Sequence, residues 1–366
     1  MSELNETPRA NRIHIAFFGL RNAGKSTLVN EFTGQALAIV SDTPGTTTDP
    51  VSKAMEILPL GPCLITDTAG LDDEGDLGEK RVEKSLQVLA TTDIAVWVTS
   101  PNDELKYQEF LSACARFNSK VIKYNRGDSI AELKRRIAAV KLEDEAPGLL
   151  TGLLKRGDKV LLVVPIDESA PKGRLILPQQ QVIRECLEQG VMASVCQPEI
   201  MSAINLDDFN LIITDSQAFA TVRSAIDEFA KTKPRLTSFS ILFARQKGDL
   251  DEFLKGITAI KNLQDGDTVL IAEGCTHHRQ CNDIGSVKIP KALTKLSGKQ
   301  FKFVFSSGMT FDGTNASLIV HCGGCMLTRR EVLRRIAKAK SRGVAIVNYG
   351  MALAAANGIN LTEVVP

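Results

Sequence analysis

Ile13-His-Ile-Ala-Phe-Phe-Gly-Leu-Arg-Asn-Ala-Gly-Lys-Ser26 joins an apolar strand-like run to a glycine-rich loop. The loop fits the pattern G-x-x-x-x-G-K-[ST], and residues 27–32 have helical spacing up to Gly34. In this strand–loop–helix context, the glycines allow backbone N–H groups to surround phosphate oxygens. Lys25 is expected to reach the β- and γ-phosphates of a nucleotide, and Ser26 to bind Mg²⁺. The loop residues expected to contact the nucleotide are Gly19, Asn22, Ala23, Gly24, Lys25, Ser26 and Thr27.

Two further segments follow in the order that a nucleotide switch requires. Ser41-Asp-Thr-Pro-Gly-Thr-Thr-Thr-Asp49 is rich in hydroxyl groups, and we expect its Thr47 to contact Mg²⁺ and the γ-phosphate. The strand expected over residues 63–66 ends in Asp67-Thr-Ala-Gly70. Asp67 is expected to hold Mg²⁺ through water, and Gly70 to sense the γ-phosphate.

These segments together resemble the translation-factor-like GTPases, in particular the MnmE and Era group. The resemblance implies that Asn22 helps to bind a potassium ion that assists GTP hydrolysis. Leu71 follows Gly70, where Ras-type enzymes have a glutamine that orients the attacking water. The resemblance implies that K⁺ and the pairing of two G domains supply the missing group.

The segment that should read guanine departs from this family, which uses Asn-Lys-x-Asp. Residues 120–125 read as a strand, and the sequence Asn125-Arg-Gly-Asp128 follows. In one interpretation Asp128 still pairs with guanine and Arg126 stacks over the base. In the other the reading segment is deleted, residues 120–125 form the last strand, and a capping box from Ser129 to Glu132 opens the final helix. The missing segment predicts weakened guanine selectivity, and both interpretations leave GTP hydrolysis open.

Size and composition limit the remaining possibilities. A chain of 366 residues suits two or three domains, and a formal net charge of +1 indicates neither nucleic acid nor an anionic membrane as a partner. No run of 18 apolar residues is present, and the first residues lack the apolar core of a signal peptide. We therefore expect a cytoplasmic protein, in which most cysteines are not disulfide-bonded. Four of the eight cysteines lie in or beside apolar stretches and are expected in the core: Cys63, Cys114, Cys186 and Cys196.

The middle of the chain alternates strand-like and helix-like segments, which predicts a small α/β unit. It contains no constellation of catalytic residues, and it suits a self-association module.

The other four cysteines fall in two clusters near the C-terminus. Strands are expected over residues 267–272 and 318–320, followed by Glu273-Gly-Cys-Thr-His-His-Arg-Gln-Cys281 and by His321-Cys-Gly-Gly-Cys325. Because the carboxyl ends of strands in an open α/β sheet share one crevice, Cys275, Cys322 and Cys325 are expected to meet. Thiolates select zinc or iron–sulfur clusters. Spacing alone does not decide between them, and the candidates for a fourth ligand are His277, His278, His321 and Cys281.

The spacing Cys275-x-His277 and then His321-Cys-x-x-Cys325 resembles the signature of the HydF-type FeFe-hydrogenase maturation GTPases. The stretches "VPIDESAPKGRLILP", "LTSFSILFARQKGDL" and "NYGMALA" also resemble that family. The resemblance implies three α/β domains: a shortened P-loop GTPase over 1–147, a dimerisation domain over 148–233 and an iron–sulfur domain over 234–366. It implies a 4Fe-4S cluster on the three cysteines, with His277 or His321 as a possible fourth ligand and Cys281 outside the signature.

The same resemblance implies the role of the protein. A homodimeric, GTP-binding scaffold would receive a di-iron precursor, built with two radical-SAM maturases, and deliver it to apo FeFe-hydrogenase. GTP hydrolysis would then be regulatory. Two alternatives are a zinc-delivering GTPase metallochaperone and a potassium-dependent tRNA-modifying GTPase.

Overall fold

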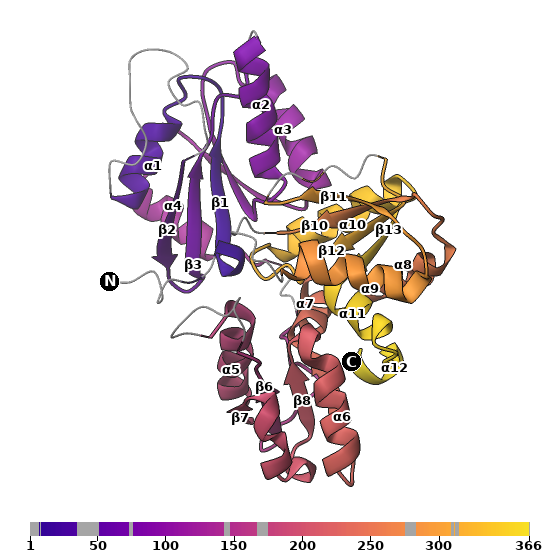
Figure 1. The fold of residues 1–366 in the computed structure, drawn as a ribbon. Helices are drawn as coiled ribbons and strands as arrows, with labels where there is room; N and C mark the ends of the chain where they lie inside the picture. Colours follow the sequence, from indigo (N-terminus) through magenta and orange to yellow (C-terminus); the bar gives the residue numbers. More distant parts are fainter. Residues whose placement is uncertain are drawn as a thin grey trace. The chain divides into compact units, whose positions relative to one another are not determined.

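The chain forms two compact units, residues 1–145 and 146–366. The structure is a computed structural model, and it describes residues 7, 9–34, 51–72, 76–142, 147–166, 175–274, 283–308, 311 and 315–365 (Figure 1). Five residues considered above lie outside the described residues: Thr47, Cys275, His277, His278 and Cys281.

Unit 1 contains a five-stranded sheet in the order β2-β3-β1-β4-β5. Only β2 is antiparallel to its neighbour. The strands are β1 (Ile13–Phe18), β2 (Val51–Ile57), β3 (Gly61–Asp67), β4 (Ile94–Val98) and β5 (Lys120–Tyr124). The helices are α1 (Lys25–Thr33), α2 (Asp76–Leu89), α3 (Glu104–Arg116) and α4 (Ile130–Ala138), and a 3-10 turn covers Arg9–Asn11. The strand, loop and helix predicted around the glycine-rich loop are confirmed.

The alternation of side chains along β1 builds a core on each face of this sheet. Phe17 packs against Phe32 of α1, with ring centroids 5.4 Å apart. Phe18 packs against Phe110 of α3 on the other face, at 5.1 Å. Helix α4 lies on the α1 face, because its Leu133 belongs to the same buried cluster as Phe32. The final helix of unit 1 in the described residues is thus a neighbour of the first.

The first sheet of unit 2 is fully parallel, in the order β7-β6-β8-β9. Its strands are β6 (Lys159–Val163), β7 (Met192–Cys196), β8 (Leu211–Thr214) and β9 (Arg235–Ser238). The helices of this part are α5 (Leu177–Gln189), α6 (Phe219–Phe229) and α7 (Phe239–Lys247), with 3-10 turns at Pro198–Ala203, Leu206–Asp208 and Ser216–Ala218. Because β9 pairs with β8, this sheet continues past residue 233, where the sequence placed a boundary.

The second sheet of unit 2 is also parallel, in the order β11-β10-β12-β13. Its strands are β10 (Thr268–Ala272), β11 (Lys302–Ser306), β12 (Leu318–His321) and β13 (Ala345–Asn348). The helices are α8 (Leu250–Asn262), α9 (Ile289–Ser297), α10 (Arg329–Ser341), α11 (Tyr349–Ala356) and α12 (Leu361–Val364), with a π-helical turn at Ile284–Lys288. In this register Ala272 is opposite His321, and His321 is opposite Asn348. The carboxyl ends of three strands therefore meet at one edge, as predicted.

The two sheets of unit 2 share one buried apolar cluster, which runs from Leu161 in β6 to Val364 in α12. The Thr237 hydroxyl of β9 donates to the Val364 carbonyl at 2.7 Å, which ties the first sheet to the last helix. The four cysteines expected in the core are buried and unpaired, which confirms that prediction. None of the helices in the described part of the chain combines the length and the apolar composition that a membrane span requires.

Helix α8 crosses β13 so closely that only glycine fits at position 256. A Cβ atom at Gly256 would lie 2.1 Å from the Ile346 carbonyl oxygen. We expect Gly256→Ala to destabilise unit 2 by about 1–3 kcal/mol in urea unfolding, although alanine is the better helix former. Thr258→Ala, at an exposed position of the same helix, is the matched control and should change little. Equal stability of the two variants would contradict this packing.

Candidate functional site

The glycine-rich loop connects β1 to α1, and its backbone needs residues that tolerate left-handed conformations. Gly24 has φ 89° and Asn22 has φ 60°. Gly19 has φ 152°, and a Cβ atom there would lie 2.6 Å from the Val98 carbonyl oxygen. Asn22 and Thr27 are exposed, whereas Ala23 is buried. The loop therefore has the shape that allows backbone N–H groups to turn towards a phosphate.

Lys25 is buried within this loop. Its Nζ atom donates to the Leu20 carbonyl at 2.7 Å and to the Gly19 carbonyl at 3.2 Å. The ammonium group is thus held inside the curve of the loop, where phosphate oxygens would need a positive charge.

Ser26 and Asp67 form a pair beside the loop, because β1 and β3 are parallel neighbours and Phe17 is opposite Asp67. The Ser26 hydroxyl donates to Asp67 Oδ2 at 2.6 Å. Asp67 is fully buried, and its Oδ1 atom has no hydrogen-bond partner among the described residues. Burial raises the pKa of this carboxyl group. A buried carboxylate oxygen without a partner, next to a hydroxyl group, fits the oxygen donors that Mg²⁺ requires.

The segment after β3 lies directly on the loop. A Cβ atom at Gly70 would be 2.8 Å from the Arg21 amide nitrogen, and that amide donates to Asp72 Oδ1 at 2.5 Å. The Leu71 amide donates to the Gly19 carbonyl at 3.2 Å. The Leu71 side chain packs against the apolar cluster that contains Phe18. It therefore offers no polar group to a water molecule at the phosphates.

The segment Asn125–Asp128 forms a turn held by hydrogen bonds between its first and last residues. The Asp128 carboxylate accepts from the Asn125 amide at 3.0 Å, and the Asp128 amide donates to the Asn125 carbonyl at 3.0 Å. The Tyr124 hydroxyl donates to the Asp128 carbonyl at 2.9 Å. Ser129 occupies the N-cap position of α4 but its side chain makes no capping hydrogen bond, so the capping box predicted there is wrong.

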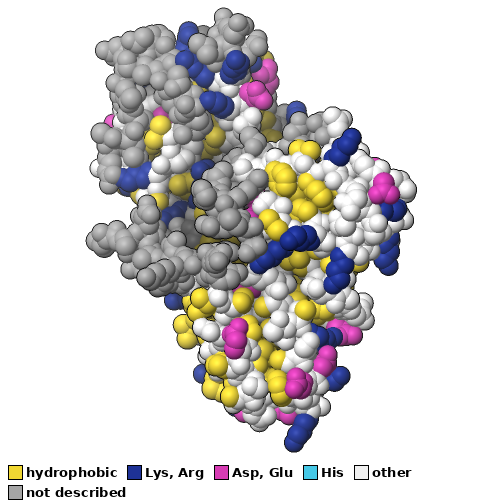
Figure 2. Space-filling model, in the orientation of Figure 1, with side chains coloured by type: hydrophobic (Ala, Val, Ile, Leu, Met, Phe, Trp, Pro, Cys, Tyr) yellow, Lys and Arg dark blue, Asp and Glu magenta, His cyan; other side chains and the backbone are white. Residues whose placement is uncertain are grey.

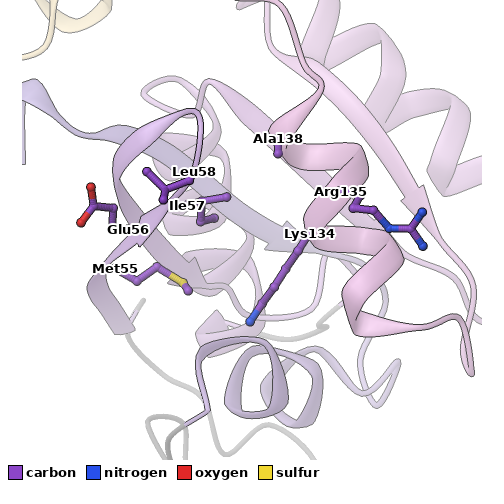
Figure 3. Close-up of a pocket in the computed structure, with 7 residues that line it drawn as sticks. All are labelled: Met55, Glu56, Ile57, Leu58, Lys134, Arg135 and Ala138. Carbon is purple, nitrogen blue, oxygen red and sulfur yellow. The ribbon is translucent and has the colours of Figure 1, made fainter.

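A shallow hollow of about 260 Å³ lies between the end of β2 and α4. Its lining residues are Met55, Glu56, Ile57, Leu58, Lys134, Arg135 and Ala138. Figure 3 shows that Lys134 extends across the hollow, whereas Arg135 points away from it. The Lys134 ammonium lies 5.2 Å from the Phe32 ring centroid. The hollow contains none of the predicted site residues, and we assign no chemistry to it.

In unit 2, the loop Cys322-Gly-Gly-Cys325 follows β12 and bends at two glycines. Gly324 has φ 69°, and Gly323 lies against Ser240 of α7. The Gly274 amide donates to Cys322 Sγ at 3.1 Å. The residue before Cys275 therefore touches Cys322, as the predicted edge of the sheet requires. Within the described residues no three Cys, His, Asp or Glu side chains are arranged around one metal position.

Burial determines the state of these thiols. It raises the pKa of Cys322 to about 11 and also raises the pKa of Cys325, for which the Lys247 ammonium opposes the shift. A thiol with a pKa of about 11, as for Cys322, is protonated at neutral pH, and metal binding would have to release its proton.

His321 is almost fully buried, and both of its ring nitrogens have protein partners. Nδ1 lies 2.7 Å from the Cys322 carbonyl, which can only accept, so Nδ1 carries the proton. Nε2 lies 3.3 Å from Arg335 Nη1, which can only donate. Burial and then the Arg335 charge lower the pKa of His321 to about 4. His321 is thus a neutral imidazole, and the lone pair on its Nε2 atom already accepts a hydrogen bond from Arg335.

Arg335 is itself held by a buried network that sequence reasoning missed. Its Nε atom donates to Glu331 Oε1 at 2.7 Å, and its Nη2 atom to the Gly308 carbonyl at 2.6 Å. The Thr328 hydroxyl accepts from the Glu331 amide at 3.3 Å and so caps the N-terminus of α10. A buried Arg–Glu pair four residues apart on a charged helix has no distinctive signature in the sequence.

Lys247 is the second residue that sequence reasoning missed. Its Nζ atom donates to the carbonyls of Leu327, Gly324 and Cys325, at 2.8, 3.2 and 3.2 Å. Burial lowers the pKa of Lys247 to about 8, although the nearby Cys325 and Cys322 groups act in the opposite direction. The cysteine loop is therefore anchored on the end of α7.

The Ser26–Asp67 pair leads to a prediction for the first site. Asp67→Asn should reduce the gain in nucleotide affinity that Mg²⁺ provides by about tenfold or more, about 1.4 kcal/mol, because the amide has no charge for the metal. Titration of a fluorescent nucleotide with and without Mg²⁺ measures this gain. Asp93→Asn is the control, because its carboxylate accepts from the His14 amide at the opposite end of the strands. An unchanged Mg²⁺ dependence in Asp67→Asn would show that Asp67 does not serve the metal.

Comparison with known proteins shows that the N-terminal part of the chain is similar to GTPases. Residues 14–126 match the family described as 50S ribosome-binding GTPase. Among curated proteins, the tRNA modification GTPase MnmE of Exiguobacterium sibiricum is 32% identical over 164 residues, 42% of this chain and 35% of that protein. GTPase Der of Xylella fastidiosa is 36% identical over 134 residues, 34% of this chain and 28% of that protein. The chain thus spans about a third of the length of these curated relatives.

The solved structures similar to this chain are distant from it in fold and in sequence. Era of Aquifex aeolicus has a TM-score of 0.27 and 15% identity, over 81% of this chain and 92% of that chain, which is too distant to carry an argument.

The rest of the chain matches two models of a single family. Residues 149–248 match the hydrogen maturase F dimerization domain, and residues 251–365 match the hydrogen maturase F tetramerization domain. The two matches meet at the end of α7 and together cover more than half of the sequence. With a P-loop GTPase domain before them, they show that the chain belongs to the HydF-type hydrogenase maturation GTPases.

Proposed function

We propose that this protein is a GTP-binding scaffold that holds a 4Fe-4S cluster and delivers a di-iron precursor to apo FeFe-hydrogenase. The observation that carries this proposal is the contact between the Gly274 amide and Cys322 Sγ. It brings the residue that precedes Cys275 to the Cys322–Cys325 loop. These three cysteines are therefore our candidates for the ligands of the cluster.

The donor chemistry favours iron–sulfur over zinc. Three thiols and a fourth position filled by a weak or exchangeable ligand suit a 4Fe-4S cluster, whereas structural zinc is held by four protein ligands. His321 is a poor fourth ligand, because Arg335 already donates to its Nε2 atom. We propose that His321 and Arg335 shape the wall of the site and that His277 is the better candidate. When bound, the cluster would offer one iron to which the cargo can attach.

In the N-terminal unit we propose that GTP and Mg²⁺ bind at the glycine-rich loop. Lys25 supplies positive charge to the phosphates, while Ser26 and Asp67 hold the metal. Thr47 would complete the metal site, and Gly70 would sense the γ-phosphate. We propose that GTP hydrolysis is regulatory and depends on K⁺ at Asn22 and on the pairing of G domains, because the Leu71 side chain packs against the apolar cluster and offers no polar group.

The position of α4 supports deletion of the guanine-reading segment. In the described residues, α4 follows β5 and packs beside α1, so the domain closes directly after Asp128. The Asp128 carboxylate is also engaged with the Asn125 amide in its own turn. We therefore propose a shortened GTPase domain over residues 1–147 that selects guanine weakly.

Self-association is supported by the exposed edges of the two sheets in unit 2. Figure 2 shows hydrophobic side chains on the surface of this unit. Met192 and Val195 on edge strand β7, and Val304 and Phe305 on edge strand β11, are exposed apolar side chains. Exposed edge strands of this kind favour pairing between chains. We propose that residues 148–233, extended through β9, form the homodimer, and that residues 234–366 carry the cluster and meet apo FeFe-hydrogenase and the radical-SAM maturases in the cytoplasm.

Anaerobic reconstitution with iron and sulfide tests the cluster. Cys275→Ala, Cys322→Ala and Cys325→Ala should each lose most of the iron, the brown absorption near 400 nm and the EPR signal of the reduced protein. Cys186→Ala is the matched control, since Cys186 lies on α5, buried in a cluster with residues of β6, and its loss should leave the iron–sulfur cluster intact. A colourless wild-type protein that carries stoichiometric zinc would refute the assignment. Binding of tRNA would instead favour a tRNA-modifying role.

Competition between nucleotides tests the shortened GTPase domain. Affinities for GTP and ATP should lie within about two orders of magnitude, against the ~10⁴–10⁵ reached by sites that hydrogen-bond the correct substrate. Asp128→Asn separates the two interpretations of this loop. If the loop is only a turn, the variant keeps the same ratio of GTP to ATP affinity. A selective loss of GTP binding would show that Asp128 reads the base.

A further inference from the structure

Lys247 is a buried cation whose described partners are all neutral. Its side chain is 5% exposed, and its ammonium group donates to three backbone carbonyls of the cysteine loop. The Phe243 ring centroid lies 5.1 Å from Nζ. Within the described ranges of unit 2, no Asp or Glu side chain forms an ion pair with Lys247.

Such an arrangement needs an anion. Moving an ammonium group out of water costs several kcal/mol, and buried charges in proteins are generally paired. Carbonyl oxygens satisfy the three N–H donors but carry only partial charge. Lys247 donates to carbonyls of the loop that carries Cys322 and Cys325. Metal binding would convert these thiols to thiolates and so supply the negative charge.

We propose that Lys247 is the positioning residue and counter-ion of the cluster-binding loop. Its three hydrogen bonds hold the turn from Gly324 to Leu327, and its charge stabilises the two thiolates together with the anionic cluster they carry. This inference rests on the proposed 4Fe-4S site. A reduced cluster has one more negative charge than an oxidised cluster, so a fixed buried cation favours reduction.

Lys247 and the cysteine loop belong to segments that match two different domain models. Helix α7 lies in the segment that matches the dimerization domain, whereas the loop lies in the segment that matches the tetramerization domain. Ser240, at the start of α7, lies against Gly323, and Arg329 donates to the Gln246 carbonyl at 2.7 Å. The loop that would hold the cluster thus rests along its length on a helix of the neighbouring segment.

Two variants separate the charge of Lys247 from its hydrogen bonds. Lys247→Met removes both, while Lys247→Gln removes the charge and keeps N–H donors. Arg329→Met is the matched control, because it removes a positive charge from the same helix junction without touching the loop carbonyls. All measurements use the full chain, and circular dichroism with thermal melting establishes that each variant is folded. If Lys247→Met does not fold, Lys247→Gln and the control decide the outcome.

Hydrogen–deuterium exchange of the apo protein reports on the loop without any cluster. We expect amide exchange in residues 324–327 to be about tenfold faster in Lys247→Met, and close to wild type in Lys247→Gln and Arg329→Met. After anaerobic reconstitution, an EPR-monitored dithionite titration reports on the charge. Both Lys247 variants should lower the equilibrium constant for one-electron reduction about tenfold, a shift of about 59 mV to more negative potential.

The results distinguish a failure of the proposed role of Lys247 from a failure of the proposed cluster site. Wild-type iron content, potential and exchange in both Lys247 variants would overturn the role of Lys247 while leaving the cluster in place. A wild-type protein that takes up no iron would overturn the proposed function and the counter-ion role with it. Faster exchange in Lys247→Met would then still establish Lys247 as the anchor of the loop.

Discussion

The parallel pairing of β10 with β12 is the constraint on which the C-terminal site depends. Parallel strands end at the same edge of a sheet, so residues 273–274 and 321–322 become neighbours although they are about fifty positions apart in the sequence. The hydrogen bond from the Gly274 amide to Cys322 Sγ is the direct product of that register. A shift of one residue would turn each of these side chains to the other face of the sheet. The predicted cysteine site therefore relies on backbone pairing before any side chain acts.

The candidate sites of the two units differ in how many separate segments of the chain form them. In unit 1, one continuous segment from β1 to α1 contains most of the residues proposed to contact the phosphates. In unit 2 the loop is local, but its surroundings come from α7, α10 and β10. The second site is therefore a property of the whole unit, and α7 joins the two halves of it.

Local motifs were read well from the sequence, because they depend on short-range geometry. The glycine-rich loop and the Asp67 at the end of a strand both lie where their patterns predict. The capping box predicted at Ser129 was wrong, since the Ser129 side chain makes no capping hydrogen bond. His321 looked like a candidate ligand because imidazole beside a cysteine pair often binds metal. The structure engages both of its nitrogens with Cys322 and Arg335.

The sequence alone indicated the glycine-rich loop, the family and the cysteines that we propose for the second site, because these depend on residue identity and on spacing of a few positions. Only the tertiary structure revealed that Arg335 occupies the lone pair of His321, that Lys247 lies beneath the cysteine loop and that α4 closes the sheet beside α1. Each of these contacts joins segments that the chain brings together only by packing. A lysine or an arginine in a helix looks like a solvated surface residue until the fold removes it from water.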